Sequence, residues 1–356
     1  RRLQEQSQTA PLRLSHIHSF RAIAILLIVA GHSLDEFSWQ AHPGQEALLL
    51  DLVENGTVLF VFIAGYLFEY LLPRYRYGEY LTKKFTNVIL PYLIVSLPAM
   101  LHRFLMEDPA RLYPQIQGMP VWYQVLWYYV KGGAHMNFPL WFIPMITVYY
   151  LLAPVFQQIS RHPRWFYLLV LLVPLSVAIH RQESPNLNLL HSTVYFLSAY
   201  VAGMWACRYS KQIEPKLERH WLALGIGFVA MIAVHYVFAP KHGNYESVVP
   251  FSQENGPIDW MFLIKLYMCF ALLGVLRRFD AFWAPKLAYL ADISFAIFFV
   301  HAYFMLALSV LFKVHTVEGN FFVWSIDYVA IMAVTVAAIW LAKKVLGDNS
   351  RYVIGS

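Results

Sequence analysis

Two residues in the first apolar segment have the types and the spacing for chemistry. Arg21 and His32 are separated by ten residues in the run Phe-Arg-Ala-Ile-Ala-Ile-Leu-Leu-Ile-Val-Ala-Gly-His-Ser. At about 100° per residue, eleven steps make roughly three helical turns, so both side chains share one helix face, about 16 Å apart along its axis. Ionisable residues inside apolar spans cost free energy unless they are shielded, and histidine exchanges protons near neutral pH. We therefore expect both side chains to enter a protein-lined cavity.

Simpler interpretations of this pair stay open. Arg21 can extend to the lipid headgroups while His32 caps the outer end of the helix. Asp35, one turn beyond His32, either orients the imidazole or faces water. His301 lies deep in a later apolar run, seven residues after Ser294 and on the same helix face. Its depth, about 20 Å from the inner end of that run, matches the depth of His32, although a lone buried histidine is most often a hydrogen-bonded structural residue.

The composition defines the elements that must position these residues. Of the 356 residues, 59% are hydrophobic and only 13% are charged, which leaves too little polar surface for a soluble body. Soluble, disordered and fibrous classes are excluded, and the net charge of +6 is read as topology, not as nucleic-acid binding. Cys207 and Cys269 both lie in apolar stretches, so we expect no disulfide framework and no metal site.

The apolar runs predict an all-α polytopic membrane protein with about ten transmembrane helices in a single domain, residues 1–356. The first run does not read as a signal peptide, since an arginine and a histidine interrupt it and no cleavage pattern follows. The segment 106–138 is too polar to span and predicts an extracytoplasmic loop with an interfacial helix. The expected spans are 17–34, 52–71, 86–105, 139–158, 165–180, 188–207, 220–238, 259–276, 287–312 and 321–342.

The basic residues predict the orientation of these spans. With both termini cytoplasmic, the inside segments carry 19 Lys and Arg residues and the outside segments carry 6. Basic residues accumulate on the cytoplasmic side of membrane proteins, so this split favours an even number of spans and two cytoplasmic ends.

With these residues in view, the chain resembles acyltransferase family 3, the bacterial integral-membrane acyltransferases of glycans and related acceptors. Five segments in order carry the resemblance. They are Arg21 to His32, Leu59 to Leu67 with Gly65-Tyr66, Lys83-Lys84 leading to Pro91-Tyr92, Leu140-Trp141-Phe142-Ile143-Pro144, and Ser294 to His301. The chain departs from the family at His18, where relatives often carry an acid, and around Asn87, where they often carry a basic residue.

The resemblance implies a donor and a set of site residues. It assigns Arg21 to the binding of acetyl-CoA or another acyl-CoA, and His32 to the catalytic centre. It also points to Ser294 and His301 as residues of the catalytic centre, and to Trp141 as a residue at the cofactor. Arginine suits the phosphates of CoA because its planar fork makes paired charged hydrogen bonds. Lys83 and Lys84 would add to a cationic cytoplasmic mouth, although each also fits as an ordinary topology residue.

The expected reaction is O-acylation, most simply O-acetylation, of a glycan or glycolipid hydroxyl outside the cytoplasmic membrane of a bacterium. The phosphates would stay near Arg21 while the pantetheine arm carries the thioester to His32, which acts as general base. Asp35 is the expected orienter of His32, and His301, Ser294 and Trp141 are candidate donors to the developing oxyanion. We expect direct transfer, with acyl-Ser294 or acyl-histidine intermediates as alternatives. The expected partners are acyl-CoA, the hydroxyl acceptor and membrane lipids, with no nucleic acid.

Two rival functions use the same features. A transporter or flippase of a glycan or lipid-linked intermediate would need the charged cavity without the chemistry. A non-catalytic assembly subunit would tolerate substitution of His32. Neither rival explains an Arg–His spacing that matches the length of a pantetheine arm.

Overall fold

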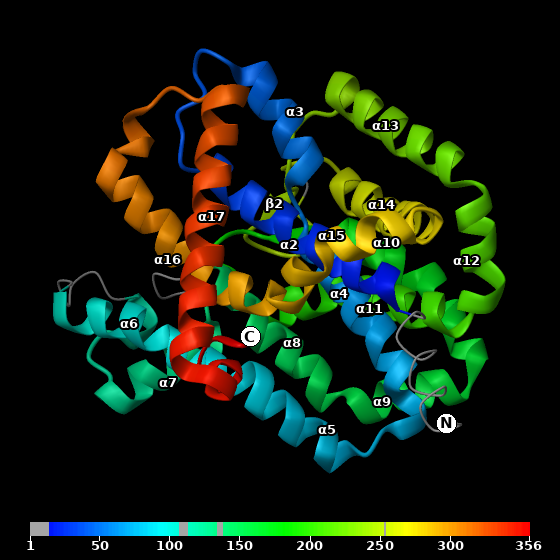
Figure 1. Ribbon diagram of the computed structural model, residues 1–356, viewed down its shortest axis with the longest axis horizontal. Helices are drawn as coiled ribbons and strands as arrows, with labels where there is room; N and C mark the ends of the chain where they lie inside the picture. Colours follow the sequence, from blue (N-terminus) through cyan, green and yellow to red (C-terminus); the bar gives the residue numbers. More distant parts are fainter. Residues whose placement is uncertain (1–13, 107–112, 134–137, 253) are drawn as a thin grey trace.

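The computed structural model describes residues 14–106, 113–133, 138–252 and 254–356 (Figure 1). In these ranges the chain is helical almost throughout, which confirms the all-α membrane class. The two strands are two residues each and pair in parallel, with Arg181 opposite Glu246 and Gln182 opposite Ser247. The elements are α2 (Ser15–Leu34), α3 (Pro43–Val53), α4 (Thr57–Leu71), α5 (Tyr77–Lys84), α6 (Leu90–Met106), α7 (Val121–Lys131), α8 (Phe142–Leu151), α9 (Ala153–Arg161), α10 (Leu169–Ile179), β1 (Arg181–Gln182), α11 (Leu189–Arg208), α12 (Ser210–Arg219), α13 (Trp221–Phe238), β2 (Glu246–Ser247), α14 (Trp260–Arg278), α15 (Asp280–Asp292), α16 (Ser294–Phe312), α17 (Phe321–Leu346) and α18 (Ser350–Ile354).

The number of spans differs from the ten expected. Within the described ranges, seven helical segments are long and apolar enough to cross a membrane, and the bent pair Pro139–Leu151 with Ala153–Arg161 makes an eighth if it counts as one span. Pro163–Ile179 is apolar but short, and α11 has the length but carries polar residues. The count of ten is therefore not confirmed, although each expected span coincides with helix.

Helix α2 lies at the centre of the bundle (Figure 1). It contacts α3, α4, α14, α15, α16 and α17, and most of its side chains are buried. Helix α13 lies at the periphery, packed mainly on α14, with little of its surface buried. The residues on α2 are therefore shielded by protein, as the cost of ionisable groups in a membrane requires.

Helices α4 and α11 approach so closely that only glycine fits at their contact. A Cβ atom on Gly65 would lie 1.9 Å from the carbonyl oxygen of Tyr200, and a Cβ atom on Gly203 would lie 1.9 Å from the carbonyl oxygen of Phe62. Small residues allow such backbone approach between membrane helices, where close packing drives association. This pair forms one wall of the core beside α2.

Helix breaks fall beside the expected site residues. The expected span 287–312 is divided, because α15 ends at Asp292 and α16 begins at Ser294. This break places Ser294 in the first turn of α16 with His301 about two turns further along the helix. Between α5 and α6, residues Phe85–Ile89 form a π-helical turn directly after Lys84.

The expected extramembrane segment 106–138 is described only in part. Residues 107–112 and 134–137 lie outside the described ranges. Between them, α7 is an 11-residue helix with exposed Trp122 and Tyr123 and buried Tyr128. A helix this short does not cross a membrane.

Candidate active site

Helices α2 and α16 meet through two polar contacts, and these contacts join four of the predicted site residues. Arg21 Nη2 donates a hydrogen bond to Ser294 Oγ at 3.0 Å. His32 Nδ1 and His301 Nε2 lie 3.0 Å apart, with ring planes within 3° of parallel. The shared helix face predicted for Arg21 and His32 therefore packs against α16.

The hydrogen bonds of His301 fix the proton positions of both histidines. His301 Nδ1 lies 2.8 Å from the carbonyl oxygen of Ile297 and 3.0 Å from that of Phe298. Carbonyl oxygens only accept, so Nδ1 of His301 carries the proton and its Nε2 accepts from Nδ1–H of His32. In neutral His32 the unprotonated nitrogen is then Nε2. This is the tautomer that a general base needs.

His32 lines a polar cavity of about 210 Å³, here called the His32 cavity. Its polar wall comes from segments far apart in the sequence: the end of α2, the turn after α3, and the loops around β1 and β2. The wall includes Asp35, Glu54, Arg181, Asn186, Asn244 and Glu246. Three acidic residues and one arginine make this cavity unfavourable for phosphate and suitable for groups that donate hydrogen bonds.

Arg181 organises the wall opposite His32. Its guanidinium lies 3.9 Å from Glu54 Oε2 and 3.8 Å from Glu246 Oε1, and its Cζ lies 5.7 Å from the centre of the Trp141 ring. Asn244 donates a hydrogen bond to Glu54. The β1–β2 pairing holds Arg181 opposite Glu246, so the two strands position the charged groups of the cavity.

Four residues of this wall are not among the site residues predicted from the sequence: Glu54, Arg181, Asn244 and Glu246. Arg181 counted only as a basic residue outside the membrane, Asn244 and Glu246 stood in a polar segment between apolar runs, and Glu54 fell near the start of the expected span 52–71. The available signals were an acidic residue, Glu54, inside an expected span and a basic residue, Arg181, directly after one. Neither signal shows which segments meet in space. Asn244 and Glu54, for example, are 190 positions apart in the sequence and hydrogen-bond to each other.

Asp35 lies at the rim of the His32 cavity with its side chain open to solvent. Desolvation by the surrounding protein, together with the nearby Glu54 and Glu246 carboxyl groups, raises the pKa of Asp35 to about 7. The orienting contact that the structure gives to Nδ1 of His32 comes from His301. The role of Asp35 as orienter therefore stays a prediction.

A second cavity, also of about 210 Å³, lies nearer the start of α2 and is here called the Arg21 cavity. Its charged lining residues are Arg21 and Lys84, and no acidic residue stands among the described residues that line it. Lys84 Nζ lies 4.7 Å from the centre of the Tyr150 ring and 5.4 Å from that of Tyr80. Lys83, by contrast, is exposed and does not line this cavity.

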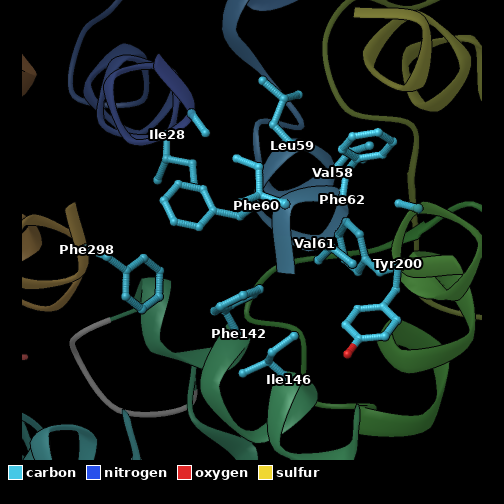
Figure 2. Close-up of a cluster of buried hydrophobic side chains, with 14 of the residues drawn as sticks. Ile28, Val58, Leu59, Phe60, Val61, Phe62, Phe142, Ile146, Tyr200 and Phe298 are labelled. Atoms are coloured by element: carbon cyan, nitrogen blue, oxygen red, sulfur yellow. The ribbon is translucent and has the colours of Figure 1, made fainter. Parts of the chain in front are cut away.

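A third, very small cavity, here called the constriction, shares lining residues with both of the others. It encloses about 10 Å³, close to the volume a single water probe occupies. His32 and Trp141 belong to both this constriction and the His32 cavity, while Phe60 and Phe142 belong to both the constriction and the Arg21 cavity. Figure 2 shows Phe60, Phe142 and Phe298 pointing toward one another from three different elements.

The other predicted residues divide between the two ends. Ser294 is fully buried, accepts from Arg21 and donates to the carbonyl oxygen of Ala291, and it lines neither the His32 cavity nor the constriction. Trp141, predicted at the cofactor, lines the His32 cavity and not the Arg21 cavity. The structure thus pairs His32 with His301, and Arg21 with Ser294.

The fold and the site together define the class: a helical membrane protein whose buried site contains a histidine pair, one polar cavity and one cationic cavity. Comparison with known proteins places it further. The family model described as Acyltransferase domain (Acyl_transf_3) matches residues 15–344, nearly the whole chain. The chain therefore belongs to this family and is a membrane acyltransferase, which confirms the predicted resemblance. Neither a curated protein nor a solved structure matches it significantly.

Proposed function

We propose that the protein transfers an acyl group, most simply acetyl, from acyl-CoA to a hydroxyl of an extracytoplasmic glycan or glycolipid. The observation that carries this proposal is the position of His32, whose Nε2 is the unprotonated ring nitrogen and which lines both the polar cavity and the constriction. In this proposal, the two cavities divide the two substrates by charge.

The Arg21 cavity suits the CoA side. Arg21 and Lys84 supply positive charge without a competing carboxylate in the described lining, and the aromatic and aliphatic lining suits a thin pantetheine chain. Ser294 holds the guanidinium of Arg21 in place and thus acts as a positioning residue. The acidic His32 cavity suits a neutral, hydroxyl-rich acceptor and repels the phosphates of CoA.

The step itself is a direct acyl transfer. His32 Nε2 takes the proton of the acceptor hydroxyl while the hydroxyl oxygen attacks the thioester carbonyl carbon. The C–S bond breaks, an ester forms, and the CoA thiolate receives the proton. His301 accepts from Nδ1–H throughout and so stabilises the imidazolium that His32 becomes during the step.

The test uses purified full-length protein, radiolabelled acetyl-CoA and the glycan and glycolipid fractions of the bacterial cell envelope. His32→Ala should lower transfer about 10²- to 10⁴-fold, the usual contribution of a general base, while acetyl-CoA still binds. Arg21→Ala should weaken acetyl-CoA binding. Lys83→Ala is the matched control, because Lys83 is exposed and outside the cavity. Wild-type transfer by both His32→Ala and Arg21→Ala would refute the assignment.

A further inference from the structure

A second cluster of polar side chains lies beside the His32 cavity. Among the residues that the structure describes, Asp51, His235 and His242 form the one group of three whose ligand atoms all lie within 4.8 Å of one another. Asp51 comes from α3, His235 from the last turn of α13, and His242 from the loop that follows. Asp51 Oδ2 lies 2.9 Å from Nδ1 of each histidine.

The cluster is buried and its carboxylate is fixed. Asp51 is 0% exposed and His235 is 5% exposed. The backbone N–H of Gly243 donates to Asp51 Oδ1 at 3.0 Å, which turns Oδ2 toward the two imidazoles. Two nitrogen atoms and one oxygen atom thus converge from three separate segments.

The contact between His235 and Asp51 is short but poorly aligned for a hydrogen bond. His235 Nδ1 is close to Asp51 Oδ2, but within the described part of the chain it is buried without a partner in hydrogen-bond geometry. Its other nitrogen, Nε2, lies 3.1 Å from the hydroxyl of buried Tyr245. When Nε2–H donates to this phenol oxygen, the Nδ1 lone pair faces a carboxylate, and a cation between these two electron-rich atoms stabilises the contact; when Nδ1 carries the proton instead, it faces Asp51 directly and no cation is needed.

We propose that Asp51 Oδ2, His235 Nδ1 and His242 Nδ1 bind a divalent transition metal of the zinc type. Imidazole and carboxylate are ordinary zinc ligands, and Tyr245 is the outer partner that ligating histidines usually have. Tetrahedral zinc separates its ligand atoms by about 3.3 Å, so each Asp–His contact would open by a few tenths of an ångström. His242 can supply this movement because it lies in a loop with its side chain 28% exposed, which also leaves access for a water as fourth ligand.

The rival explanation is an ion pair without metal. Lys265 is fully buried and donates to the carbonyl oxygens of Asp51 at 3.2 Å and Leu52 at 2.6 Å. Its contacts cap the end of α3 and do not occupy the space between Asp51 and the histidines. In the rival, a protonated histidine would balance Asp51, and added metal would have no effect.

The metal would fix one wall of the His32 cavity. Glu54 follows Asp51 by one helical turn, Asn244 follows His242 by two residues, and both line the cavity and hydrogen-bond to each other. A metal joining Asp51 to His242 would hold the 239–247 loop against α3. This consequence for the acceptor side rests on the proposed function, whereas the metal site itself does not.

The test is metal content and metal-dependent stability of the full-length protein, purified in detergent with a tag that binds no metal. Wild type and the control His220→Ala, an exposed histidine at the end of α12, should retain about one zinc per chain by elemental analysis. After chelation, zinc should raise their thermal midpoints. His242→Ala and Asp51→Asn should bind zinc at least tenfold more weakly and show no such shift.

Other outcomes would overturn the site. Wild type that neither retains metal nor responds to zinc supports the ion pair, and His242→Ala that binds zinc as tightly as His220→Ala places the metal elsewhere. If Asp51→Asn does not fold, His242→Ala alone decides between the two explanations. The His242 side chain is half-buried and lies in a loop, so this variant should still fold. Metal content is read without any acyl-transfer assay, so the failure of this proposal and the failure of the proposed function are distinguishable.

Discussion

Replacing His301 by leucine tests the histidine pair most directly. Leucine keeps the buried volume on α16 but removes the Nε2 acceptor that lies 3.0 Å from His32 Nδ1. In the ground state this is a neutral hydrogen bond, worth about 0.5–1.5 kcal/mol, and when His32 becomes an imidazolium it is a charged one, worth about 1.5–3 kcal/mol. The difference, about 1–2 kcal/mol, lowers kcat by roughly 5- to 30-fold. Loss of the fixed tautomer adds to this effect.

The assay is steady-state transfer of labelled acetyl from acetyl-CoA, with kcat and KM measured separately for His301→Leu and His301→Gln. Glutamine keeps an acceptor oxygen and should recover part of kcat. The KM for acetyl-CoA should stay unchanged in both, because Arg21 contacts Ser294 and not His301. Leucine also leaves Nδ1–H of His32 without its acceptor, so the thermal midpoint should fall.

Two results would refute the reasoning. If His301→Leu keeps the wild-type kcat, His301 does not hold His32 for proton transfer. If the whole loss appears in the KM for acetyl-CoA, His301 acts on donor binding and the division into two cavities is wrong. A folded His301→Gln variant with no recovery over leucine would show that an acceptor at this position is not what matters.

Three further predictions concern other parts of the molecule. Gly203→Ala should prevent stable folding, because its Cβ would lie 1.9 Å from a carbonyl oxygen of α4, whereas Gly225→Ala, which meets nothing within 4 Å, should leave the thermal midpoint unchanged or slightly raised. Asp35→Asn should be more stable than wild type at pH 8. The folded state raises the pKa of the Asp35 carboxyl to about 7, so the ionised carboxylate destabilises the folded protein relative to the unfolded chain, and asparagine removes this cost. This advantage should shrink as the pH falls from about 7 to about 4, measured as paired thermal midpoints. Lys84→Ala should raise the KM for acetyl-CoA while Lys83→Ala does not, since only Lys84 lines the Arg21 cavity; equal effects would show that bulk surface charge is responsible.

The sequence predicted what depends on one helix and missed what depends on packing between helices. The shared face of Arg21 and His32 follows from the helical repeat, and the matched depth of His301 follows from counting along a span. That His32 touches His301, 269 positions away, depends on how α2 packs against α16. The acidic wall of the His32 cavity depends on the β1–β2 pairing, which two residues per strand do not reveal.

The span count was uncertain for a related reason. Hydropathy treats every apolar run as facing lipid. Helix α11 instead packs against α4, and some of its polar atoms bond to protein: His191 Nε2 lies 3.0 Å from the carbonyl oxygen of His180, and Thr193 donates to that of Leu189 at 2.7 Å. Such a helix reads as less apolar than a lipid-facing one although it has 20 residues. Composition therefore identifies which segments are helical, but it does not show well which of these helices face lipid and which lie in the protein core.

The relation between the two cavities distinguishes transfer from transport. A transporter must pass its whole substrate, so it needs a route with compatible lining at both ends. Here one cavity is cationic and the other is acidic, and the small cavity that shares lining residues with both, with Phe60, Phe142 and Phe298 in its wall, encloses only about 10 Å³. A phosphate-bearing cofactor held at Arg21 would be repelled from the acidic end, and only a thin uncharged chain carrying an acyl group suits both sides of such an aromatic constriction. The position of His32 at that constriction is where a base must lie if the acyl group, and not the molecule that brings it, crosses to the acceptor.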